Sequence, residues 1–196
     1  MFYALAKYYI NSISSLITFN KAEKFLGIPL TTVENFSYYL TYAYLIFFVS
    51  RFSYSLKERE KSPKKVYCID TGLRNALGLS SSIDYGRCLE NIIFLELKRR
   101  GYNIYYWKDQ YGKEVDFVLQ EGRKITLIQV CWDIENPDTH KREIRSLLKA
   151  MDEFKLQVAW VITSEYEGEE KINNKTIKFV PAWKWLLEKK IQSNNI

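Results

Sequence analysis

Apolar positions recur at helical spacing through the first forty residues. The pattern predicts one helix over residues 2–17 and a second, short helix over residues 21–26. The chain then breaks before Pro29. Thr31 and Glu34 have the spacing of a capping box, which predicts that a third helix begins with Thr31 as its N-cap. Helix, turn and capped helix in this order are typical of a helix-turn-helix.

Strand-like segments and a charged loop follow these helices. Residues 45–56 and 66–69 are rich in apolar and aromatic side chains and are expected to form strands. The loop between them, residues 57–65, carries five basic and two acidic side chains. Two strands joined by a basic loop after the helices predict a winged-helix domain over residues 1–80. The Ser- and Gly-containing stretch 78–86 is expected to link it to a second domain.

The pattern changes after this link to one helix followed by alternating strands. Helices are expected at residues 86–100 and 139–154, and strands at 103–107, 113–119, 124–131 and 157–163, with a last strand and helix within 176–189. The order is α-β-β-β-α-β. It predicts a second domain over residues 86–196, with helices packed on a mixed sheet, and an α+β or α/β fold class for the chain.

Polar side chains interrupt two adjacent predicted strands at matching places. Because side chains alternate along a strand, Gln129 and Cys131 share a face, and Asp116 on the preceding strand can face the same point. A metal-dependent nuclease carries Asp and Glu-x-Lys at such positions, since Mg²⁺ prefers carboxylate oxygens and a lysine stabilises charge on the phosphate. Asp116 meets the first need. Gln129 is neutral, and Cys131 is soft and supplies no cation.

Two acidic residues, Glu90 and Asp116, each have an alternative interpretation. Glu90 shares the inward face of its helix with Ile93 and Leu97, so its carboxylate needs a partner there. It is either a further metal ligand beside Asp116 or an acid favoured by the helix N-terminus. Taken alone, Asp116 could also be a surface acid paired with Lys113.

Charge and composition narrow the function classes. The chain has 29 Lys and Arg against 23 Asp and Glu, a net charge of +6 that suits nucleic-acid contact. Cys68, Cys88 and Cys131 lack CxxC spacing, and His140 is the only histidine, so no zinc site is expected. No apolar run is long enough to cross a bilayer, and the N-terminus lacks a signal-peptide pattern. A cytoplasmic protein with reduced thiols and no membrane contact is expected.

The predicted winged helix offers two kinds of contact. Asn35 could read adenine in duplex DNA, although residues 31–50 contain no Lys or Arg. The basic loop could hold phosphates through Lys57, Arg59, Lys61, Lys64 and Lys65. A tyrosine-rich helix is equally suited to protein docking. Nucleic-acid and protein contact therefore both stay open.

An ordered series of motifs resembles a known family. The stretches Tyr67-Cys-Ile-Asp-Thr-Gly-Leu73, Leu89-Glu-Asn91, Gly112-Lys-Glu-Val-Asp-Phe117 and Pro181-Ala-Trp-Lys-Trp-Leu186 are similar to the domain of unknown function that follows the ATPase module in many archaeal and bacterial AAA-type ATPases. The resemblance covers nearly the whole chain. It implies a winged helix followed by a PD-(D/E)XK nuclease-like domain with the restriction-endonuclease-like fold.

The resemblance also implies a set of site residues. They are Glu90, Asp116, Gln129 and Cys131, the last two standing at the family's Glu and Lys positions. These departures predict a catalytically weakened module, with Mg²⁺ bound weakly if at all. Arg142 on the following helix is a substitute cation or, as we prefer, a surface charge paired with Glu143.

The sequence contains no P-loop motif, so this chain is not expected to hydrolyse ATP. It is expected to be a fragment, a truncated gene or a free-standing partner of an AAA-type ATPase. The favoured interpretation is a degenerate, non-enzymatic nuclease-fold module that binds nucleic acid or docks the ATPase. The alternatives are an active Mg²⁺-dependent nuclease and a protein-interaction module without a nucleic-acid role.

Overall fold

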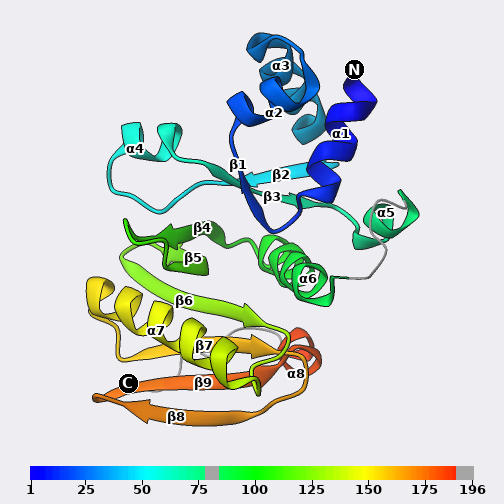
Figure 1. Ribbon diagram of the computed structural model, residues 1–196. Coiled ribbons are helices and arrows are strands. Elements are labelled where there is room, and N and C mark those ends of the chain that lie inside the picture. Colours follow the sequence, from blue (N-terminus) through cyan, green and yellow to red (C-terminus); the bar gives the residue numbers. More distant parts are fainter. Residues whose placement is uncertain (78–83, 189–196) are drawn as a thin grey trace. The chain divides into compact units, whose positions relative to one another are not determined.

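The computed structural model describes residues 1–77 and 84–188 (Figure 1). The expected linker at 78–86 falls largely outside the described residues. The chain divides into two compact units, Met1–Ile92 and Ile93–Ile196. Helix α6 (Tyr85–Arg99) runs through this division, so its first half belongs to the first unit and its second half to the next.

The first unit combines helices with a small antiparallel sheet. Its elements are α1 (Phe2–Asn11), β1 (Ser15–Ile17), α2 (Phe19–Leu26), α3 (Leu30–Tyr42), β2 (Ile46–Val49), α4 (Leu56–Lys61), β3 (Lys64–Cys68), α5 (Thr71–Ala76) and the start of α6. The strand order is β1-β3-β2. Figure 1 shows α1, α2 and α3 gathered on one side of this sheet. The core between them includes Leu5, Ile13, Val33, Leu40 and Ile46.

The structure corrects the first predicted helix. It ends at Asn11, and the positive φ of Ser14, 59°, turns the chain so that Ser15–Ile17 becomes the edge strand β1. The backbone N–H of Ser14 donates to the carbonyl of Val66 at 2.7 Å, which starts the pairing with β3. Helical spacing of apolar residues continued through the turn because the turn and strand also face the core.

The predicted capping box is also wrong. Helix α3 begins at Leu30 with Pro29 at the N-cap, and no side chain caps it. Thr31 therefore lies inside the first turn. The carbonyl of Pro29 accepts hydrogen bonds from the N–H groups of Thr32 and Val33 at 2.9 and 3.1 Å, so the helix begins two residues earlier than a cap at Thr31 would place it.

The basic loop expected at residues 57–65 contains regular structure. Helix α4 occupies its first part, and the hydroxyl of Ser55 accepts a hydrogen bond from the N–H of Glu58 to cap it. The last two residues, Lys64 and Lys65, belong to β3. The preceding strand is shorter than predicted, and only Ile46–Val49 pairs with β3.

The second unit is built on a six-stranded mixed sheet with the order β4-β5-β6-β7-β9-β8. Its elements after α6 are β4 (Asn103–Lys108), β5 (Glu114–Glu121), β6 (Lys124–Cys131), α7 (Pro137–Phe154), β7 (Val158–Thr163), β8 (Gly168–Ile172), β9 (Lys175–Pro181) and α8 (Ala182–Leu187). β4, β5 and β6 are antiparallel, whereas β6, β7 and β9 run parallel. The α-β-β-β-α-β order and the mixed sheet are thus confirmed.

Candidate nuclease-like site

Asp116 and Gln129 meet where two strands begin to separate. The register of the β5–β6 pair ends at Phe117 and Ile128, which are the chain neighbours of Asp116 and Gln129. Beyond that point, hydrogen bonds between side chains and the backbone take the place of the backbone pairing between the strands. The backbone N–H of Asp116 donates to Oε1 of Gln129 at 3.1 Å, and the N–H of Val130 donates to Oδ2 of Asp116 at 2.9 Å. The prediction that Asp116 and Gln129 lie on neighbouring strands of one sheet is confirmed.

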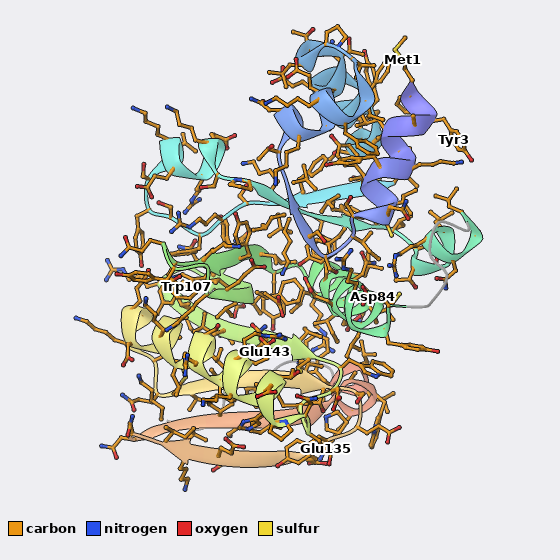
Figure 2. All side chains as sticks on the ribbon, viewed as in Figure 1. Met1, Tyr3, Asp84, Trp107, Glu135 and Glu143 are labelled. Carbon is orange, nitrogen blue, oxygen red and sulfur yellow. The ribbon has the colours of Figure 1, made fainter. Side chains whose placement is uncertain are left out.

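A third residue, Glu143, completes this cluster from helix α7 (Figure 2). The Nε2 group of Gln129 donates to Oε2 of Glu143 at 2.7 Å. From the sequence, Glu143 was expected only as a partner of Arg142. Its spacing to Leu147 and Ala150, four and seven positions on along the buried face of α7, was the signal that places it toward the sheet.

Arg142 is engaged by the same glutamate. Its Nε and one terminal nitrogen donate to Oε1 of Glu143 at 3.0 and 2.7 Å, and its side chain is 70% exposed. The preferred interpretation of Arg142 as an exposed charge paired with Glu143 is confirmed. The guanidinium of Arg142 is therefore bound to a carboxylate of the protein itself.

Asp116, Gln129 and Glu143 line a hollow of about 360 Å³, together with Lys113 and Arg142. Burial raises the pKa of the Glu143 carboxyl, and the charge of Asp116 raises it further, while the hydrogen bond from Arg142 opposes both. The hollow therefore holds a carboxylate whose ionisation is disfavoured.

Cys131 remains a neutral thiol in this setting. Burial raises its pKa to about 12, with the charges of Glu143 and Asp116 adding to the effect. A thiol that stays protonated at neutral pH is a poor nucleophile. It also supplies no positive charge for a phosphate.

The residues of this site fit a divalent cation poorly. Mg²⁺ requires several free oxygens in near-octahedral geometry. Here the oxygen of Gln129 accepts from the backbone of Asp116, and Oδ2 of Asp116 accepts from Val130. Within residues 1–77 and 84–188, no group of three or more His, Cys, Asp or Glu side chains is arranged to hold a metal ion.

Glu90 has its partners within the first unit. Its Oε1 receives a hydrogen bond from the hydroxyl of Tyr67 at 2.7 Å and lies 2.9 Å from the ammonium of Lys65. The expectation that a carboxylate on this apolar helix face needs a partner is met by a buried lysine. These contacts account for Glu90 without a metal ion. The next residue, Asn91, exchanges two hydrogen bonds of 2.9 Å with the backbone of Cys68.

Three of the five cations that were predicted to bind phosphates contact other groups of the protein. Lys65 is only 2% exposed, so the expectation that it lies in an exposed loop is wrong; it belongs to β3 and pairs inward. The ammonium of Lys64 donates to Ser50 at 3.1 Å and to the carbonyl of Arg59 at 2.8 Å. Arg59 itself donates to the carbonyl of Ser53.

The remaining predicted contacts lie at the surface. Lys57 and Lys61 are exposed on α4, and Asn35 is exposed on α3. Also on α3, the rings of Tyr38 and Tyr42 stack with centroids 6.1 Å apart and are 64% and 76% exposed. Helix α4 thus presents two exposed lysines, and α3 presents an aromatic face.

These features define an α+β protein with a polar cluster at the point where two strands of a mixed sheet diverge. The chain belongs to the family described as domain of unknown function DUF4143, whose model matches residues 85–185. A second domain of unknown function, DUF8612, matches residues 1–83.

Two uncharacterized proteins are similar in sequence. One, from Methanocaldococcus jannaschii, is 41% identical over 165 residues, which cover 79% of this chain and 36% of the relative. The other, from Haemophilus influenzae, is 30% identical over 153 residues, which cover 78% of this chain and 36% of that relative. The chain therefore spans about a third of the length of the curated relatives it matches.

One solved assembly is also similar. It is a half-complex of Thermococcus gammatolerans McrB AAA+ hexamers with bound McrC, and the likeness has a TM-score of 0.39 and 15% identity over 50% of this chain and 28% of that chain. This score is too low to establish a shared fold. In the described part of the chain, no helix combines the length and apolar character needed to cross a membrane.

Proposed function

We propose that this chain is a non-cleaving nuclease-fold module that works beside an AAA-type ATPase. The proposal divides it into a winged helix at residues 1–80 and a restriction-endonuclease-like domain at residues 86–196. The helices and small antiparallel sheet of the first unit support the former, and the α-β-β-β-α-β order with its mixed sheet supports the latter. A cytoplasmic location belongs to the same proposal and draws on three free cysteines.

The bridging role of Gln129 carries the proposal. In the resembled superfamily this position provides a carboxylate for the metal ion. Here the position holds an amide, whose oxygen accepts a hydrogen bond from the backbone of Asp116 and whose nitrogen donates one to Glu143. The neighbouring lysine position holds a neutral thiol. Electrostatic groups of this kind are each worth roughly 10²–10³ in rate, so the loss of either is enough to bring cleavage near background.

The experiment is a cleavage assay on linear, nicked and branched DNA and on RNA, with Mg²⁺ or Mn²⁺. We expect no appreciable cleavage. The matched preparation of Asp116→Ala identifies contaminating nuclease, because true activity requires that carboxylate. Cleavage by the wild type that disappears in Asp116→Ala would overturn the proposal.

A second candidate, an active Mg²⁺-dependent nuclease, is favoured by one observation. Asp116 and Glu143 place two carboxylates in one hollow with the cationic Arg142. In that case Arg142→Gln should abolish cleavage, whereas Arg123→Gln, at an exposed position in the turn between β5 and β6, should retain it. The same assay therefore separates the two candidates.

The ATPase partnership draws on the family resemblance, in which this domain follows an ATPase module. We assign docking to the exposed tyrosines of α3, Tyr38 and Tyr42. Tagged chain purified from native cells should recover a P-loop ATPase identified by mass spectrometry. Tyr38→Ser with Tyr42→Ser should lose it, and Tyr54→Ser, at another site that is 84% exposed, should not. Recovery of no ATPase by the wild type counts against the partnership.

A further inference from the structure

Helix α7 carries a stripe of cations that the proposed function does not use. Lys141, Arg145 and Lys149 follow one another at intervals of four residues, so they lie along one face of the helix. Four residues advance an α-helix by about 6 Å. The cations are therefore spaced regularly along a line, at a distance similar to that between successive phosphates of a nucleic-acid strand.

This stripe lines an open groove of about 500 Å³, which we call the α7 groove. Lys113, from the start of β5, lines it as well and also lines the hollow around Asp116. The acid among its lining residues, Asp152, is bound to Lys175. The groove therefore has an excess of positive charge and adjoins the nuclease-like site.

Most of these cations are not neutralised by the protein. In the described part of the chain, no carboxylate lies within ion-pair distance of Lys113, Lys141 or Arg145. Lys149 is different, because it is bound to Asp109 and lies 4.5 Å from the centre of the Tyr111 ring. Uncompensated cations repel one another, and a polyanion in the groove would relieve that repulsion.

Tyr111 adds a feature that simple charge attraction does not need. Its side chain is 74% exposed at the turn before β5, next to the end of the cationic stripe. An exposed aromatic ring beside a basic track is the arrangement by which proteins hold unpaired bases, since every base has a face that stacks. An acidic protein segment would use the cations and leave this ring without a role.

We propose that the α7 groove binds single-stranded nucleic acid, with Lys113, Lys141 and Arg145 contacting the phosphates and Tyr111 stacking on a base. The inference rests on the proposed nuclease-like fold, because the groove leads to the position where that fold would hold a scissile strand. It assigns the contact to residues of the second unit and not to the lysines of α4 that were expected from the sequence.

The test measures binding of a labelled oligothymidine by fluorescence anisotropy over a series of salt concentrations. Lys141→Gln with Arg145→Gln should weaken binding and reduce the slope of log affinity against log salt by roughly 1.4, about 0.7 for each lost phosphate contact. The control is Arg123→Gln with Lys124→Gln, the same charge change at two exposed positions, one in the turn between β5 and β6 and the other at the start of β6. It should leave the slope unchanged.

A second pair of variants tests stacking. Tyr111→Ala should weaken oligothymidine binding between roughly fivefold and a hundredfold, whereas Tyr111→Trp should retain it. Duplex of the same length should bind more weakly than the single strand, because its bases are not free to stack on Tyr111.

Three outcomes would overturn the inference. They are no binding by the wild type even at low salt, equal losses in the two charge variants, and a polyglutamate chain that competes as well as oligothymidine of equal charge. The first of these leaves the proposed function intact, because that proposal is decided by the cleavage assay and by recovery of the ATPase.

Discussion

The Nε2 group of Gln129 donates a 2.7 Å hydrogen bond to Oε2 of Glu143. Because the other end of the same amide accepts from the backbone of Asp116, only one orientation of the side chain satisfies both partners. A glutamate at position 129 could not donate to Glu143. The amide is therefore fitted to this cluster.

Substitution of Gln129 by Glu should make the site dependent on metal. The variant would place three carboxylates together, so we expect it to lose about 1–3 kcal/mol of stability without divalent cations. Mn²⁺ should raise its Tm more than that of the wild type, since binding to the folded state alone stabilises it. Thermal unfolding with and without Mn²⁺ measures both effects. Gln157→Glu, at an exposed position, is the control, and an equal response there would contradict the prediction.

Glu143→Gln should change how stability depends on pH. The raised pKa of Glu143 means that the folded state holds this proton more tightly than the unfolded chain. Its contribution is therefore most favourable below its ordinary pKa and declines as pH rises towards the raised value. Removing the group removes that decline, so the stability of the variant relative to the wild type should rise as the pH increases above the ordinary pKa of a glutamate. Urea unfolding at several pH values tests this, with exposed Glu153→Gln expected to show no such gain.

The buried pair of Lys65 and Glu90 should show strong coupling. Lys65→Met leaves the carboxylate buried without its cation, and we expect a loss of about 3–5 kcal/mol. Lys65→Met combined with Glu90→Gln should recover much of it, because a glutamine still accepts from Tyr67. The measurement is urea unfolding of the two single variants and the double variant. Additive losses would mean that the two residues are not coupled.

The exposed lysines of α4 give a separate prediction about duplex DNA. If the first unit contacts phosphates, Lys57→Gln with Lys61→Gln should reduce the salt slope of duplex binding by roughly 1.8. Lys21→Gln with Lys24→Gln on α2 is a matched control within the same unit. Duplex binding that is unaffected by the α4 variant would exclude this helix as a contact.

Most strands of the second unit's sheet were predictable, because alternating apolar and polar side chains mark the strands and Gly-containing turns mark their ends. Strand β8 was missed, since Glu169, Glu170 and Lys171 obscure the alternation on this edge strand. In the first unit, local signals misled where tertiary contacts decided the outcome. Pro29 set the start of α3 although Thr31 matched a capping box, and pairing with β3 turned residues 15–17 from helix to strand.

The site was predictable only in part for a similar reason. Alternation along β5 and β6 was sufficient to bring Asp116 and Gln129 together. The third member, Glu143, comes from a helix, and the sequence does not show which strand that helix packs on. The burial of Lys65 was equally hidden, because its charge suggested exposure and only its partner Glu90, 25 positions later, makes burial tolerable.

The course of α6 bears on how this protein could be reshuffled in evolution. The two family models meet between residues 83 and 85, so the model of the C-terminal segment covers the whole helix. Yet Glu90 and Asn91, near its start, are the partners of Lys65 and Cys68 in the N-terminal segment. Recombination at the junction would bring in a foreign helix and leave a buried lysine without its counter-charge. The two segments are thus expected to descend as a pair, each fitted to the other across a boundary that looks free to exchange.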